Sequence, residues 1–132
     1  MDYLPEGSQF SLGYHYIWQQ DDTNSGDSKY LMDYLKHKIS LHAGMKFLGA
    51  GRINIDLYWA DRAGEYTDWD IHGVPFQRPY DPLVTVDLRV NWGIGRTGFN
   101  AGISNLFNAE YADIGHVWQP GRWITVGVNY EL

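Results

Sequence analysis

Residues 83–92 read LVTVDLRVNW, and from Val84 onward apolar and polar side chains alternate. The apolar set is Val84, Val86, Leu88, Val90 and Trp92, and the polar set is Thr85, Asp87, Arg89 and Asn91. An α-helix would spread both sets around its axis, whereas a β-strand places alternate residues on opposite faces. The segment therefore predicts a strand with one apolar face and one polar face.

The same period of two recurs along the whole chain. It predicts six antiparallel strands, near residues 9–19, 36–47, 52–61, 83–92, 97–107 and 121–131. The alternation is weakest in the fifth of these, and no long helix is expected from residue 36 onward. Strands of this length are about twice the modal strand of a globular protein, and they match tilted strands that cross a bilayer.

Short and long connections alternate between the predicted strands. The short ones are LGAGR (48–52) and GIGRT (93–97), both rich in glycine, as tight hairpins require. The long ones lie near residues 20–35, 62–80 and 108–120. In an up-and-down meander this order places the short turns at one end and the long loops at the other, which is the asymmetry of membrane β-barrels.

Aromatic residues mark both ends of the predicted apolar face. Those toward the long loops are Tyr16, Trp18 and Trp59, and those toward the short turns are Phe47, Trp92, Phe99 and Tyr130. Aromatic girdles with aliphatic residues between them are typical of lipid-facing surfaces. We therefore expect an all-β fold: an antiparallel up-and-down meander of about six long strands, part of a transmembrane β-barrel. The alternative is a soluble barrel or sandwich with a dry core.

Composition limits the classes of function. The chain has 132 residues, which suits one domain, and a formal net charge of -6, which argues against binding nucleic acid. It contains no cysteine, so no disulfide and no thiolate metal site is expected. No apolar run is long enough for a transmembrane helix, and the first ten residues lack the features of a secretory signal.

Two short segments match the residue patterns of ligand-binding loops only in part. Residues 93–98, GIGRTG, match G-x-G-x-x-G, but a strand follows where a dinucleotide site needs a helix. Residues 68–73, DWDIHG, resemble the start of a calcium loop, yet His72 and Pro79 stand where acidic or amide ligands are needed. A solvated loop is the expectation here, and a looser ion site is the alternative. The five histidines have no metal-binding spacing, and no nucleophile with a base is evident. We expect a non-enzyme without a cofactor or a metal.

The predicted long loops carry side chains suited to ligand capture. The candidates are Trp69, Arg78, Tyr80, His116 and Trp118. Aromatic and arginine side chains on loops commonly supply binding energy. Packing at the rim of a barrel is the alternative role for each of them.

The last eight residues, TVGVNYEL, follow a pattern of polar, glycine, aromatic and hydrophobic positions. These positions are Thr125, Gly127, Tyr130 and Leu132. The pattern resembles the C-terminal signal by which assembly machinery recognises outer-membrane barrels. That signal usually ends on Phe or Trp, and Leu132 departs from it.

Residues 105–132 carry a more specific resemblance. The sequence NLFNAEYADIGHVWQPGRWITVGVNYEL resembles the last hairpin of a TonB-dependent outer-membrane receptor. The motif positions are Asn105, Leu106, Phe107, Tyr111, Pro120, Gly121 and Arg122. The resemblance implies a barrel of about 22 strands around a plug domain. Residues 1–132 would form one C-terminal part of that barrel, without the plug and the earlier strands.

The resemblance also implies a function and partners. Such a receptor sits in the outer membrane of a Gram-negative bacterium and takes up a scarce ligand: siderophore-bound iron, haem, cobalamin or a glycan. TonB would act through the plug, and the segment would contact lipid, the plug and the remaining strands. The alternatives are a soluble β-barrel that binds a ligand and a porin-like protein that closes its barrel by self-association.

Overall fold

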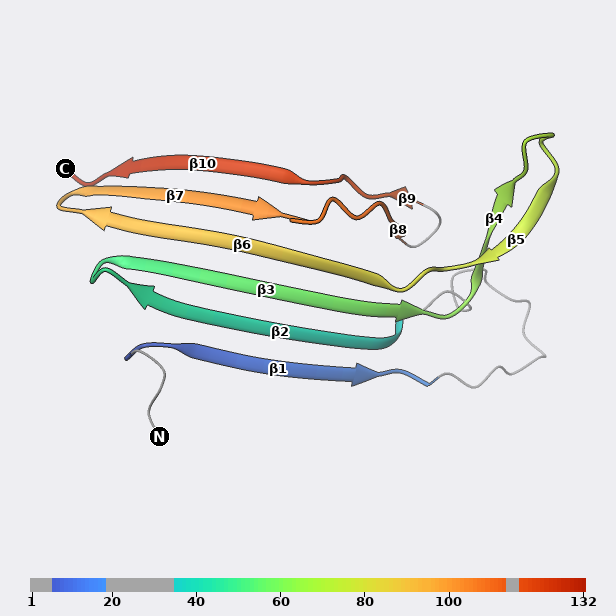
Figure 1. The fold of residues 1–132 in the computed structure, drawn as a ribbon, viewed down its shortest axis with the longest axis horizontal. Helices are drawn as coiled ribbons and strands as arrows, with labels where there is room; N and C mark the ends of the chain where they lie inside the picture. The colour runs from blue at the N-terminus through green and yellow to red at the C-terminus, as the bar shows by residue number, and fades with distance from the viewer. Residues whose placement is uncertain (1–5, 19–34, 114–116) are drawn as a thin grey trace.

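The computed structural model describes residues 6–18, 35–113 and 117–132, and within these ranges it contains strands and no helix. Six long strands form one antiparallel sheet in the order β1-β2-β3-β6-β7-β10 (Figure 1). Their bounds are β1 Gln9–Tyr16, β2 Leu35–Phe47, β3 Gly51–Arg62, β6 Leu83–Ile94, β7 Thr97–Ser104 and β10 Trp123–Tyr130. The predicted six-stranded up-and-down meander is confirmed. No helix among these residues is long and apolar enough to span a membrane.

The described connections divide between the two ends of the sheet as expected. The long connection expected near residues 20–35 lies outside the described residues, apart from Leu35. Figure 1 shows the β2–β3 and β6–β7 turns at one end, and the hairpin between β3 and β6 and the loop between β7 and β10 at the other. Gly49 and Gly95 lie in the tight turns with φ of 73° and 60°. This left-handed backbone carries little cost for glycine, which explains its place in both turns.

Two of the segments expected as loops contain additional short strands. Residues 62–80 include a separate hairpin, β4 Glu65–Trp69 and β5 Pro75–Pro79, and residues 108–120 include β8 Ala112–Asp113 and β9 Val117–Trp118. The fifth strand was predicted to reach residue 107, but β7 ends at Ser104. Asn105 has a φ of 52°, so the chain leaves the extended conformation there.

The strand register sorts the sheet into two faces. One transverse row of directly paired residues is Phe10, Ala43, Ile55, Leu88, Ile103 and Ile124, and the next row contains Leu12, Leu41, Leu57 and Val86. The opposite face carries rows such as Ser11, His42, Asp56 and Asp87. The alternation in sequence therefore becomes one continuous apolar face and one continuous polar face.

No second layer of the described residues packs against the apolar face. Among the described residues, Ala60 is the one hydrophobic residue that is buried. On the apolar face, Ile124 is 69% and Val126 is 81% exposed. A soluble sheet buries one face to gain stability, at about 25 cal/mol per Å² of apolar surface. This sheet therefore needs an apolar environment or partner that lies outside the described residues.

On the polar face, glycines pair with short polar residues across strands. Gly127 lies opposite Asn100, Gly98 opposite Asn129, and Gly102 opposite Thr125. A Cβ atom on Gly127 would lie 2.6 Å from Oδ1 of Asn100, because the amide folds over the glycine. The glycines therefore give these polar side chains room to lie flat on the sheet.

Candidate ligand-binding site

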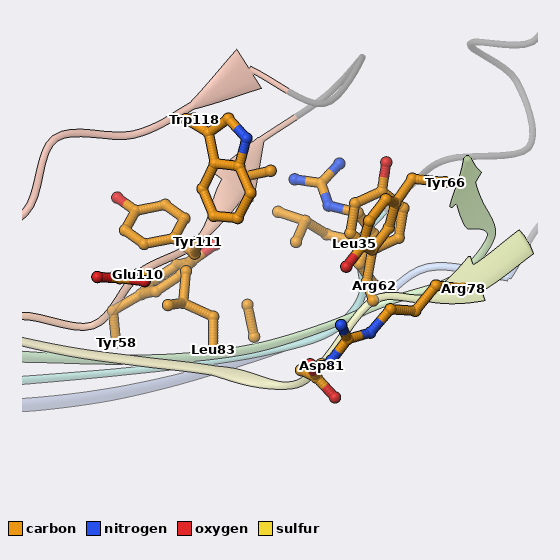
Figure 2. Close-up of a pocket in the computed structure, with 13 residues that line it drawn as sticks. Leu35, Tyr58, Arg62, Tyr66, Arg78, Asp81, Leu83, Glu110, Tyr111 and Trp118 are labelled. Atoms are coloured by element: carbon orange, nitrogen blue, oxygen red, sulfur yellow. Dashed lines mark hydrogen bonds and ion pairs between the residues drawn. The ribbon is translucent and has the colours of Figure 1, made fainter. Parts of the chain in front are cut away.

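A pocket of about 390 Å³ opens on the polar face, at the end of the sheet where the long connections lie. Its floor comes from β2, β3 and β6, and its two walls come from the β4–β5 hairpin and from the loop between β7 and β10 (Figure 2). The lining residues are Leu35, Tyr58, Ala60, Arg62, Tyr66, Arg78, Tyr80, Asp81, Leu83, Glu110, Tyr111, Ala112 and Trp118. Small-molecule sites commonly enclose about 300–1,000 Å³.

The floor follows from strand geometry. Tyr58, Ala60 and Arg62 are alternate residues of β3, so they share its polar face. Ala60 pairs with Leu83 on β6, and Leu35 pairs with Arg62. Ala60 is 4% exposed and carries a short side chain, so the floor is low between the larger Tyr58 and Arg62.

The hairpin wall is held by aromatic and ionic contacts. The rings of Tyr66 and Tyr80 lie 5.2 Å apart, and the Arg62 guanidinium lies 5.6 Å from the centre of the Tyr80 ring. Arg78 contacts Asp81 at 3.3 Å and Asp68 at 3.7 Å. These ion pairs are largely exposed and contribute little to stability, but they orient the guanidinium of Arg78.

The loop wall presents Glu110, Tyr111 and Trp118. The backbone N–H of Gln119 donates to the carbonyl of Tyr111 at 2.9 Å, and Ala112 pairs with Trp118 across β8 and β9. Figure 2 shows Tyr111 and Trp118 side by side above the floor, across from Tyr66 and Arg78 on the hairpin. The pocket is therefore bounded by segments far apart in sequence.

Hydrogen bonds at the end of β7 hold this loop. Oδ1 of Asp87 accepts from the backbone N–H of Asn105 at 2.9 Å. The side chain of Asn105 donates to the carbonyl of Ala109 and accepts from its N–H, at 2.8 and 2.9 Å. Oδ1 of Asn108 accepts from the N–H of Arg122 at 2.8 Å. We refer to Asp87, Asn105 and Asn108 as the loop clasp.

The chemistry of the pocket suits binding. Aromatic rings offer flat apolar contact, arginines and tyrosines donate hydrogen bonds, and Asp81 and Glu110 accept them. Elsewhere on the polar face, Nδ1 of His42 lies 2.7 Å from Oδ1 of Asp56, and Arg89 lies 3.9 Å from Oδ2 of the same carboxylate. Across the residues that the structure places, no group of three His, Asp or Glu side chains is arranged to hold a metal ion.

The structure brings together three of the five predicted ligand-contact residues. Arg78, Tyr80 and Trp118 line the pocket. Trp69 is 59% exposed and does not line it, and His116 lies outside the described residues. Whether any of them contacts a ligand stays a prediction.

The residues of the floor and of the rest of the walls carry no sequence signal that marks them as ligand contacts. Tyr58 and Arg62 fall on the polar face by their parity in the strand, but parity does not show how close they lie to a loop. No motif or spacing in the sequence marks Tyr66 or Glu110 as a ligand contact. Tyr111 was identified as part of the receptor-like motif and not as a pocket residue.

The remaining motif residues lie around the loop and on the last strand. Leu106 donates its N–H to the carbonyl of Val86 at 2.8 Å, and Phe107 is 67% exposed. Pro120 and Gly121 lie beside the clasp and line a smaller cavity of about 260 Å³. Among the four assembly-signal positions, Thr125 and Gly127 lie on the polar face, whereas Tyr130 and Leu132 are exposed.

Comparison with known proteins gives a structural match. No family model matches the chain, and no curated protein matches it significantly. The fold is similar to the crystal structure of the ferripyoverdine receptor of the outer membrane of Pseudomonas aeruginosa bound to ferripyoverdine, with a TM-score of 0.74 and 18% sequence identity. The match covers 96% of this chain and 18% of that receptor, so the chain spans less than a fifth of its length.

Proposed function

We propose that the chain is the C-terminal part of the β-barrel of a TonB-dependent outer-membrane receptor, which takes up a scarce ligand. The plug and the earlier strands of the barrel would be supplied by the rest of the receptor, and TonB would act through the plug. The ligand belongs to one of four classes: siderophore-bound iron, haem, cobalamin or a glycan. Uptake proceeds by binding and release, so the segment is not an enzyme.

The single observation that carries the proposal is the apolar face of a long-stranded meander, on which none of the residues placed by the structure forms a second layer. Val84, Val126 and Val128 are 42%, 81% and 67% exposed, while the opposite face is polar. In a bilayer the apolar face meets lipid and the polar face meets the lumen. The similarity to a segment of the ferripyoverdine receptor, an outer-membrane protein, supports the same assignment.

The pocket is the proposed ligand contact of this segment. It lies at the end of the sheet with the long connections, which in membrane barrels is the extracellular end. Arg78, Tyr80 and Trp118 would contact the ligand together with floor residues such as Tyr58. Tyr130 and Leu132, with Thr125 and Gly127, would serve as the assembly signal.

Uptake in a Gram-negative host tests the proposal. We expect the full-length receptor to fractionate with the outer membrane and to import one of four labelled probes: a ferric siderophore, haem, cobalamin or an oligosaccharide. Import should require both the receptor and TonB. A protein that fractionates as soluble, or import that is unchanged in a host without TonB, would contradict the proposal.

A further inference from the structure

The loop clasp lies outside the ligand pocket, yet it fixes the segment that forms one pocket wall. We propose that Asp87 and Asn105 are positioning residues of the ligand site: they turn the loop over the polar face and thereby hold Glu110, Tyr111 and Trp118 against the sheet. The use of the site rests on the proposed function. The positioning itself rests on the hydrogen bonds of the clasp.

The loop after β7 is attached to β6 by two hydrogen bonds. The last directly paired residues of β6 and β7 are Leu88 and Ile103. Beyond this pair, two backbone N–H groups still bond to β6: that of Asn105 donates to the Asp87 side chain, and that of Leu106 donates to the carbonyl of Val86. The chain thus stays fixed to β6 after the strand itself has ended.

The chain then turns at Asn105. Its φ of 52° is a conformation that asparagine adopts more readily than most residues. The residue is 6% exposed, and both ends of its carboxamide bond to the backbone of Ala109. A buried amide whose N–H and C=O groups both bond to one residue favours a single conformation, because leaving either group unpaired in a buried position is unfavourable. Ala109 directly precedes the first two wall residues, Glu110 and Tyr111.

The position of Tyr111 in turn fixes the position of Trp118. The carbonyl of Tyr111 accepts from Gln119, which places Trp118 beside Tyr111. Asn108 bonds to the N–H of Arg122, so the returning chain is fixed close to the clasp before β10 begins. A sequence of hydrogen bonds therefore runs from Asp87 on the sheet to the aromatic wall of the pocket.

Distances between spin labels test the positioning without any ligand. The measurement uses the full receptor, in which any cysteine outside these 132 residues is replaced by serine. The 132 residues contain no cysteine, so the two introduced thiols are then the only ones. Labels at Val84, on the apolar face, and at Val117, exposed in β9, report the distance from the sheet to the loop wall. We expect one narrow distance peak in the otherwise unchanged protein and loss of that peak in Asn105→Ala and Asp87→Leu. Asp87→Asn should keep the peak, because its amide oxygen can still accept from Asn105.

Two controls separate positioning from a general loss of folding. Asn54→Ala removes another asparagine of the polar face, on β3, and should leave the peak unchanged. Labels at Val84 and Val128 report the packing of β6 and β10, and their peak should persist in every variant. The proposal is overturned if Asn105→Ala keeps the Val84–Val117 peak, or if it abolishes both peaks. Because no ligand is added, this test and the uptake test can fail independently.

Discussion

Gly127 shows how a single residue depends on its cross-strand neighbour. An added Cβ would meet the Asn100 amide at 2.6 Å, so Gly127→Ala forces that amide to move. We expect a loss of about 1 kcal/mol in unfolding free energy, and no loss when Asn100→Ala is also present. Chemical unfolding of the four proteins in a double-mutant cycle measures this coupling.

Gly93 provides the matched control, since nothing lies within 4 Å of a Cβ added there. Replacing glycine by alanine in a strand normally stabilises by about 0.5–1 kcal/mol when space is free. Gly93→Ala should therefore be neutral or stabilising. Equal destabilisation by both alanine substitutions would show that the Asn100 contact is not the cause.

Tyr130 and Leu132 make a different prediction, which concerns assembly. If they act as a signal, Tyr130→Ala and deletion of Leu132 should lower the amount of folded receptor in the outer membrane, and Leu132→Phe should maintain or raise it. Trp92→Ala serves as the comparison, because it removes an aromatic residue of β6 at the same end of the sheet as Tyr130. Heat-modifiable migration of outer-membrane fractions measures the folded amount. If Tyr130→Ala and Trp92→Ala lower it equally, and Leu132 is dispensable, these residues only pack.

At the level of elements, the β4–β5 hairpin is separable from the main sheet. It forms its own two-stranded sheet, and Oδ1 of Asp70 closes its tip by accepting from the N–H groups of His72 and Val74, each at 2.8 Å. Replacing residues 65–79 by a short Gly-rich turn should leave the six-stranded sheet folded, because Ala60 and Leu83 still pair. Ligand uptake should fall, since Tyr66 and Arg78 leave the pocket wall.

Circular dichroism and heat-modifiable migration follow the sheet in this variant, and uptake follows the pocket. Replacing the exposed tip residue Ile71 by Ser is the matched control, since Ile71 does not line the pocket. Loss of the folded barrel on shortening would mean that the hairpin is part of the structural framework.

The elements also show what the sequence could predict. Strict alternation locates the six long strands, because a sheet with two different faces imposes it residue by residue. The β4–β5 hairpin was missed since β5, PFQRP, begins and ends with proline and has no alternation. Asn105 interrupts the alternation, but in the receptor-like motif Asn105 to Phe107 close this strand, so the sequence predicts an end at residue 107. β7 ends at Ser104, because the side-chain bonds of Asn105 turn the chain there, and these bonds are not visible in sequence.

Only the part of the candidate site that lies in the long connections could be predicted from the sequence. Arg78, Tyr80 and Trp118 stand out as large binding-type side chains in long connections. The contributions of Tyr58 and Arg62 depend on how the loop and hairpin fold back over β3. That arrangement is set by the clasp and by the strand register, which are properties of the assembled sheet.

For the whole molecule, the open sheet requires partners on its apolar face and at its edges. β1 and β10 stand at the two ends of the strand order, so each has one neighbouring strand among the described residues. In hydrocarbon, each unpaired backbone N–H or C=O group costs several kcal/mol. Further barrel strands beside β1 and β10 would satisfy these groups, which is why we propose that the chain is part of a larger barrel.

The central claim is that the apolar face of this sheet meets lipid and the polar face meets the lumen. Single spin labels at Val86 and Asp87, neighbours on opposite faces of β6, test it most directly in the membrane-embedded receptor. The label at Val86 should be accessible to oxygen, which concentrates in lipid, and shielded from a water-soluble nickel complex. The label at Asp87 should show the opposite preference. The reverse result, or equal accessibility of both labels to both reagents, would contradict the account.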